Sequence, residues 1–166
     1  MLIPVFAYGS NLCPGRLRRR APSAVPVAVA FVPAHRIFFH KHGRDGSGKA
    51  DCFWTGNPSD RVWGVVYHVS PDDKRRLDGI EGRGEHYLDR RLVAQAAGGR
   101  TLEAHVYRAH PSKIRTGLVP FTWYHRLVVI GARAHELPNE YVERLAAVSA
   151  TEDPDRERHR RELAVL

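Results

Sequence analysis

The sequence predicts one α+β domain in which most strands precede the main helices. Between residues 2 and 108, short runs in which apolar and polar residues alternate are typical of half-buried strands. Helical periodicity dominates residues 118–148 instead. Because strands and helices are largely segregated along the chain, they favour α+β over a doubly wound parallel sheet. With 166 residues, 43% hydrophobic and 27% charged, the chain has the size and composition of a single globular domain.

The chain begins with a short apolar strand that runs into a polar turn. Residues 2–6 predict the strand, and Gly9-Ser10-Asn11 predicts the turn that ends it. Ser10 and Asn11 are favourable N-cap residues, and residues 14–19 predict a short helix. A strand that ends in outward-pointing amides can bind a carboxylate or a phosphate. From these residues alone, an ordinary strand-turn-helix connection is an equally good interpretation.

The next segments predict further strands. Residues 24–40 predict two strands or one bent strand near a sheet edge, because two prolines interrupt the alternation. Residues 50–55 and 62–69 predict two strands, which the turn at residues 56–60 would join as a hairpin. Gly64 in the second of these strands leaves room for close packing.

A helix with clear end signals follows. Ser70 is a favourable N-cap and Pro71 suits the first helical position, so the helix should run to about Ile80 and stop before Gly82. A second hairpin is then predicted around two consecutive glycines, with strands at residues 87–97 and 101–108.

The last third of the chain is predicted to be helical. Residues 118–134 and 138–148 carry apolar faces at helical spacing. Residues 151–162 are almost wholly charged and are equally compatible with a helix and with disorder. We therefore divide the chain into a domain of residues 1–150 and a charged C-terminal tail of residues 151–166.

Histidines and cysteines give no metal-binding pattern. Cys13 and Cys52 lie in different segments without CxxC spacing, which predicts two unpaired thiols. His35, His40 and His42 are not accompanied by a carboxylate at ligand spacing, so we expect solvated or hydrogen-bonded histidines. No metal is therefore expected.

The net charge of +8 raises the question of nucleic-acid binding. The basic residues form separate clusters without interleaved aromatic residues, and no nucleic-acid-binding motif is present, so we do not expect a nucleic-acid partner. The positive field should instead attract small anions. No run of eighteen apolar residues and no leader-like N-terminus is present, so we expect a cytoplasmic protein without a membrane span, as a monomer or homodimer.

Four motifs in order resemble those of the gamma-glutamylcyclotransferase family, also called the AIG2-like family. They are Phe6-Ala7-Tyr8-Gly9-Ser10-Asn11-Leu12, Val62-Trp63-Gly64-Val65-Val66-Tyr67, Leu77-Asp78-Gly79-Ile80-Glu81-Gly82, and Tyr124 through Gly131-Ala132 to Leu137-Pro138-Asn139-Glu140-Tyr141. The resemblance implies a small mixed β-barrel flanked by helices. It also implies an enzyme that releases 5-oxoproline and a free amine or amino acid from a γ-glutamyl compound, without a cofactor.

The same resemblance assigns roles to particular residues. Glu81 falls on the glutamate that transfers the proton, and Tyr124 on a residue that contacts the substrate through its hydroxyl. The resemblance also implies a substrate-binding turn, whose backbone amides would hold the α-carboxylate of the glutamyl group. This turn consists of Tyr8, Gly9, Ser10, Asn11 and Leu12. Contributions of Tyr87, which follows Glu81 by six residues, and of Glu85, in the polar loop between them, are left open.

The residues around Glu81 give a separate argument. Apolar neighbours and a helix C-terminus would both raise the pKa of a carboxyl group, as a general base near neutral pH requires, whereas Arg83 would lower it. These residues alone still favour a surface glutamate. Two further functions remain open: a cyclotransferase for γ-glutamyl amines in a biosynthetic pathway, and a non-catalytic module that binds an anionic metabolite.

Overall fold

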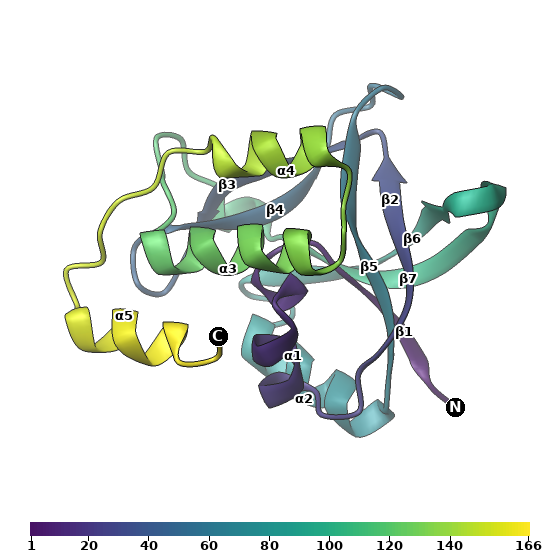
Figure 1. Ribbon diagram of the computed structural model, residues 1–166, viewed down its shortest axis with the longest axis horizontal. Helices are drawn as coiled ribbons and strands as arrows, with labels where there is room; N and C mark the ends of the chain where they lie inside the picture. Colours follow the sequence, from purple (N-terminus) through teal and green to yellow (C-terminus); the bar gives the residue numbers. More distant parts are fainter.

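The computed structural model describes residues 1–166, and its strands form a closed barrel and a separate two-stranded sheet (Figure 1). The strands are β1 (Ile3–Ala7), β2 (Val25–Pro33), β3 (His35–His42), β4 (Gly48–Trp54), β5 (Arg61–Val69), β6 (Tyr87–Ala96) and β7 (Thr101–Ala109). The α-helices are α1 (Pro14–Arg20), α2 (Pro71–Glu81), α3 (Thr122–Ala134), α4 (Asn139–Ala146) and α5 (Arg156–Leu163). Three 3₁₀ turns are η1 (Ser10–Leu12), η2 (Ala97–Gly99) and η3 (Pro111–Lys113).

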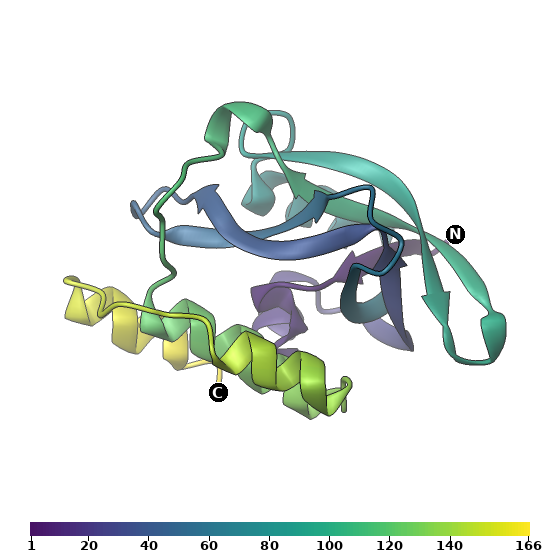
Figure 2. The same ribbon diagram turned by 90° about the horizontal axis from the view of Figure 1, so that it is seen from above.

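The barrel has the strand order β1-β5-β2-β6-β7. It closes through a parallel pairing of β1 with β7 at Val5 and His105, whereas the other neighbours are antiparallel. Helices α3, α4 and α5 lie on one side of the strands (Figure 2). The prediction of an α+β fold with a small mixed barrel flanked by helices is confirmed.

The predicted hairpin between residues 50–55 and 62–69 is wrong. Strand β4 pairs with β3, and β5 pairs with β1 and β2 in the barrel. An alternating pattern predicts a strand, but it does not select the partner of that strand. Gly64 does permit close packing, because a Cβ there would lie 2.2 Å from the carbonyl oxygen of Ala7.

Residues 24–40 form two strands, the first of the two alternatives. Ala34 connects β2 and β3 with a φ of 57°, a left-handed conformation that is uncommon for a non-glycine residue. Strand β3 then leaves the barrel and pairs with β4.

The predicted caps of α2 are both present. The Ser70 hydroxyl accepts a hydrogen bond from the Asp73 amide at 3.2 Å, and Gly82 ends the helix with a φ of 63°. Helix α3 starts at Thr122, four residues later than predicted, because Pro120 disfavours helical geometry in the residue before it.

The charged tail forms helix α5. Of the two alternatives for this segment, a helix and disorder, the structure confirms the helix. Trp123 Nε1 donates to Asp153 at 2.8 Å, and Arg16 pairs with Glu162 at 2.6 Å. These contacts hold the tail against α1 and α3. The division of the chain at residue 150 stays a prediction. None of the helices has both the length and the apolar character needed to cross a bilayer.

Candidate functional site

Two adjoining cavities are both lined by Glu81, the residue predicted from the sequence to transfer the proton. The inner cavity has a volume of about 40 Å³ and is lined by Phe6, Ala7, Tyr8, Gly9, Ser10, Asn11, Ala50, Glu81, Tyr87, Tyr107 and Tyr124. The outer pocket has a volume of about 290 Å³ and adds a rim of charged residues from α1, α5 and the β3–β4 connection. Ser10, Glu81, Tyr87 and Tyr124 line both. The carboxyl group therefore lies at their junction.

Helix α2 places Glu81 opposite the N-terminal turn. Glu81 is its last residue, and its Oε1 accepts hydrogen bonds from Asn11 Nδ2 at 3.0 Å and Arg20 Nη1 at 3.3 Å. Arg20 also donates to the side-chain oxygen of Asn11 at 2.9 Å. The carboxyl group, the turn and α1 are thus joined in one hydrogen-bonded cluster.

The surroundings of Glu81 differ from the expected ones in two respects. Its carboxylate lies among polar donors, while the apolar neighbour Ile80 is 37% exposed. Arg83 does not contact it, because its guanidinium pairs with Asp78 and Asp89. The cation beside the carboxylate is Arg20, from the opposite side of the site.

The turn after β1 contributes to the inner cavity with four of its five predicted residues. Tyr8, Gly9, Ser10 and Asn11 line the cavity. Leu12 does not: its side chain is fully buried and its amide donates to the Gly9 carbonyl at 2.9 Å, which leaves it unavailable to a ligand. The amides of Tyr8 and Gly9 make no backbone hydrogen bond. They remain available to an acceptor outside the chain.

Three of the four tyrosines that line the inner cavity have hydroxyls hydrogen-bonded to the backbone. Tyr8 donates to the backbone carbonyl of Tyr107, and Tyr87 donates to the carbonyl of Ala50 at 3.0 Å. The Tyr124 hydroxyl accepts from the Ala50 amide at 3.1 Å, so its own proton is free to be donated. Burial raises the pKa of Tyr8, Tyr87 and Tyr124, which keeps all three hydroxyls protonated.

Helix α3 packs directly against the backbone of the turn. A Cβ on Gly131 would lie 2.4 Å from the carbonyl carbon of Leu12 and 2.5 Å from the amide nitrogen of Cys13, so only glycine fits. The same helix carries Tyr124 near its start. A Cβ on Gly9 would in turn lie 3.2 Å from the Tyr124 hydroxyl. The turn and the tyrosine are therefore positioned against each other.

The roles of Tyr87 and Glu85 were left open by the sequence, and the structure distinguishes between these two residues. Tyr87 lines both cavities, whereas Glu85 lines neither and its side chain is 73% exposed. Sequence reasoning missed Arg20 and Lys41, which also line the outer pocket. Arg20 ends an arginine-rich run, but no linear pattern connects that run to a glutamate sixty-one residues later.

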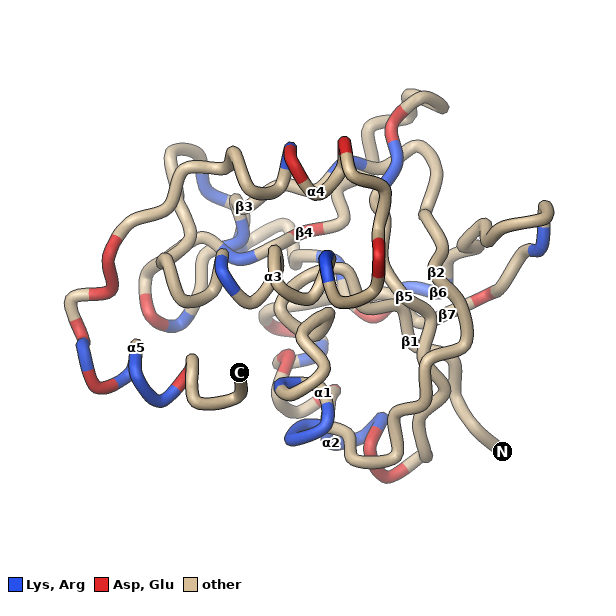
Figure 3. The backbone as a smooth tube through the Cα atoms, viewed as in Figure 1, with Lys and Arg blue, Asp and Glu red and all other residues tan.

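The outer pocket is rich in charge. Its cations are Arg16, Arg20, Lys41, Arg44, Lys49 and Arg158, and its acids are Asp45, Glu81 and Glu162. Lysine and arginine positions lie along α1, α5 and the β3 region in Figure 3. This surplus of cations favours a ligand with negative charge.

Histidines and cysteines away from the cavities have structural contacts. His40 Nε2 lies 2.8 Å from Asp51 Oδ2, and His35 Nδ1 lies 2.7 Å from the Pro33 carbonyl, as expected for hydrogen-bonded histidines. Cys13 and Cys52 are unpaired and buried. No three side chains of the metal-ligating types lie close enough together to hold an ion.

Comparisons with known proteins agree with this fold and these motifs. Residues 61–145 match the AIG2-like family. A mouse protein named gamma-glutamylcyclotransferase is 30% identical over 155 residues, which cover 89% of this chain and 79% of the relative. The human protein of that name is 30% identical over 151 residues, or 86% of this chain and 77% of the relative.

Solved structures show the same architecture. One titled gamma-glutamyl cyclotransferase superimposes with a TM-score of 0.82 at 24% identity and covers 97% of this chain and 99% of that chain. A human crystal structure superimposes with a TM-score of 0.80 at 27% identity, over 90% of this chain and 89% of the other. Motifs, fold and relatives agree, and the chain is a member of the gamma-glutamylcyclotransferase (AIG2-like) family.

Proposed function

We propose that this protein converts a γ-glutamyl compound into 5-oxoproline and a free amine or amino acid, with Glu81 as proton acceptor and donor. Membership of the family supports a cyclotransferase-type function. The observation that carries the detailed proposal is the position of the Glu81 carboxylate, at the junction of a tyrosine-lined cavity and a cation-rich pocket. One half of the substrate would lie on each side of it.

The proposed reaction is intramolecular. The α-nitrogen of the glutamyl group attacks its own γ-carbonyl carbon, a ring C–N bond forms, and the original amide C–N bond breaks. The α-ammonium group loses two protons overall, and the departing nitrogen gains two as it leaves and becomes an ammonium. Glu81 would carry one of these protons between the nitrogens, and the other would exchange with solvent. Acid–base help of this kind contributes roughly 10²- to 10⁴-fold in rate.

The binding turn would hold the glutamyl end of the substrate. The free amides of Tyr8 and Gly9, with Asn11 and Arg20 nearby, suit the α-carboxylate. The unused proton of Tyr124 would be donated to a substrate oxygen. Fixing both ends of the chain that must close into a ring removes much of the entropic cost of cyclisation. No metal or organic cofactor is needed, because the nucleophile belongs to the substrate.

A panel of γ-glutamyl amino acids and γ-glutamyl amines tests this function. The purified protein should release 5-oxoproline and an equal amount of amine from at least one of them, measured by chromatography. Absence of 5-oxoproline across the panel, combined with saturable binding of a γ-glutamyl compound, would contradict the enzyme and support the non-catalytic module. The cation-rich pocket favours that second function, since it suits an anionic metabolite.

A further inference from the structure

Lys41 and Arg44 are the two cations of the outer pocket that have no carboxylate partner. The other cations are all paired: Arg16 with Glu162 at 2.6 Å, Arg20 with Glu81 at 3.3 Å, Lys49 with Asp45 at 2.7 Å, and Arg158 with Asp153 at 2.5 Å. Lys41 is only 4% exposed, and lysines are seldom so buried without an acid beside them. The local shortage of negative charge therefore needs an explanation.

Both cations direct donors at one histidine that cannot accept from both. Lys41 Nζ lies 3.3 Å from Nδ1 of His86, and Arg44 Nε lies 3.2 Å from Nε2 of the same ring. A neutral imidazole has one accepting nitrogen, and a protonated imidazole has none. At least one donor is left without an acceptor while Lys41 is charged. An anion seated between the two cations would supply the missing acceptor.

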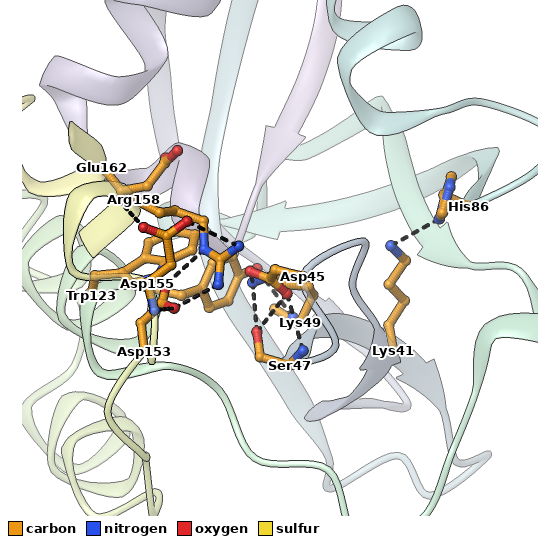
Figure 4. Close-up of polar contacts among 12 residues, drawn as sticks. Lys41, Asp45, Ser47, Lys49, His86, Trp123, Asp153, Asp155, Arg158 and Glu162 are labelled. Atoms are coloured by element: carbon orange, nitrogen blue, oxygen red, sulfur yellow. Dashed lines mark hydrogen bonds and ion pairs between the residues drawn. The ribbon is translucent and has the colours of Figure 1, made fainter. Parts of the chain in front are cut away.

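The residues nearby do not supply that acceptor. The nearest acid to the ring is Glu85, whose Oε1 lies 3.5 Å from Nε2 of His86, but its side chain is 73% exposed and pairs with neither Lys41 nor Arg44. Figure 4 shows Lys41 and His86 facing each other, apart from the network that surrounds Lys49 and Asp45. The Asp45 carboxylate is already used by Lys49 and Ser47.

This cluster lies immediately beyond the proposed acid–base residue. A Cβ on Gly82, the residue after Glu81, would lie 2.9 Å from Cδ2 of His86 and 3.1 Å from Nη2 of Arg44. Lys41 Nζ also lies 4.7 Å from the centre of the Tyr87 ring, a wall that the two cavities share. A substrate cleaved at Glu81 would extend its amine half toward these cations.

We propose that Lys41, Arg44 and His86 form a subsite for an anionic group, a carboxylate or a phosphate, on the amine half of the γ-glutamyl substrate. This assignment rests on the proposed function and narrows its substrate class. It places conjugates of anionic amines above conjugates of plain alkylamines. Lys41 and Arg44 would act as specificity-determining residues, and His86 would position them.

The electrostatics of the cluster support the assignment. Burial, with contributions from Lys49, Arg44 and Lys113, lowers the pKa of Lys41 to about 8, although Glu81 opposes the shift. Burial and the neighbouring cations also lower the pKa of His86, although Glu85 opposes that shift. An anion at this point would favour the charged form of Lys41, so ligand binding and protonation would reinforce each other.

Matched substrates test the subsite directly. The γ-glutamyl conjugates of β-alanine, of phosphoethanolamine and of propylamine carry a carboxylate, a phosphate and no charge on amine halves of similar length. The wild-type protein should show a kcat/KM at least roughly tenfold higher for an anionic conjugate than for the propylamine one. Lys41→Met should reduce this preference at least fivefold, chiefly through KM. Arg44→Gln, at an exposed position, should reduce it without the risk of misfolding.

Arg100→Gln is the control, since it removes an equal charge from an exposed residue that does not line the pocket. It should keep the wild-type preference. An unchanged preference in both Lys41→Met and Arg44→Gln, or equal kcat/KM for the three conjugates, would overturn the subsite while the proposed function stands. The ratio between the carboxylate and phosphate conjugates identifies the preferred anion.

Absence of turnover would reject the proposed function, and the subsite would then be tested by binding alone. Inorganic phosphate should move the ring signals of His86 in nuclear magnetic resonance spectra of the wild-type protein. The same titration should give a weaker response in Arg44→Gln and an unaltered one in Arg100→Gln. Unmoved His86 signals in the wild-type protein would reject the subsite as well.

Discussion

The inner cavity and the outer pocket meet at Glu81, but they are built from different chemistry. The inner cavity is small, and its polar lining consists of tyrosines, backbone groups, Ser10, Asn11 and a single charged residue, Glu81. The outer pocket is about seven times larger and is bordered by long charged side chains. Strand β4 contributes to both, since Ala50 lines the inner cavity and Lys49 lines the outer pocket.

Under the proposed function, the inner cavity would hold the constant glutamyl part of the substrate and the outer pocket its variable amine part. Short side chains, backbone amides and tyrosines locked by hydrogen bonds can hold one compact group in a single geometry. Long lysines and arginines adapt to ligands of different length, as long as these carry the right charge. The chemical step should therefore depend on the inner cavity, and the choice of amine on the outer pocket.

The largest expected effect comes from Glu81→Gln. This variant keeps an acceptor for Asn11 and removes the ability to take up a proton, so kcat should fall by at least roughly 10²-fold with little change in melting temperature. Glu85→Gln, at an exposed position outside both cavities, is the control and should retain the wild-type rate. A Glu81→Gln variant with full activity would remove the acid–base role from this residue.

Gly9→Ala should have the next largest effect, because it narrows the inner cavity only. The added Cβ would lie 3.2 Å from both the Ala50 Cβ and the Tyr124 hydroxyl. Displacement of reacting groups by a few tenths of an ångström should lower kcat/KM roughly tenfold. The control is Gly79→Ala in α2, where a Cβ meets nothing within 4 Å. It should stabilise the helix by about 0.5 to 1 kcal/mol without slowing turnover.

A smaller effect should follow from pH, and it should affect the outer pocket alone. The pKa of Lys41 is about 8, so its charge is present below pH 8 and is lost above it. The preference for an anionic amine half should therefore fall severalfold as the pH rises through 8, measured as a ratio of kcat/KM values. Lys41→Met should show no such fall. A ratio that stays constant from pH 7 to 9 in the wild-type protein would contradict this role.

The lowered pKa of Lys41 also predicts how the stability of the protein depends on pH. Its pKa in the folded protein lies below the ordinary value of 10.5, so the unfolded chain binds more protons between pH 8 and 10.5. The contribution of Lys41 to the free energy of unfolding should rise across that window. Comparison of wild type and Lys41→Met by denaturant unfolding at both ends of the window measures it.

The smallest expected effect concerns the rim that α5 provides. Glu162→Gln weakens the pair with Arg16, which should lower the free energy of unfolding by about 1 kcal/mol and alter kcat/KM by less than threefold. Glu152→Gln, in the same tail but without an ion pair, is the control. A large loss of rate in Glu162→Gln alone would show that the tail does more than border the pocket.

Local signals predicted those parts of the fold that depend on neighbouring residues. The caps at Ser70 and Gly82 set the ends of α2 because they satisfy backbone groups within one turn. The partner of β4 could not be found in this way, because short polar turns flank it on both sides and the alternating pattern does not choose between a hairpin with β3 and one with β5. The partners of β5, in contrast, are the more distant strands β1 and β2, and their pairing depends on the closed barrel as a whole.

The candidate site shows the same limit. The turn at residues 8–12 and the acid at position 81 were located through motifs, and the structure places Asn11 in contact with that acid. Arg20, Lys41 and His86 carry no recognisable pattern, because their roles arise only after α1, β3 and the segment that follows α2 come together. Charge composition alone indicated a small anionic ligand, without locating the residues that would bind it.

The absence of a side chain at Gly131 has a consequence for variants of this protein. Helix α3 packs against the backbone of the N-terminal turn at Gly131 and also carries Tyr124. The position of this one helix therefore fixes both the turn and the tyrosine. Any residue larger than glycine at position 131 would shift these two parts in concert. Catalysis would then be lost through a change nearly two helical turns from Tyr124, in a protein that could still fold.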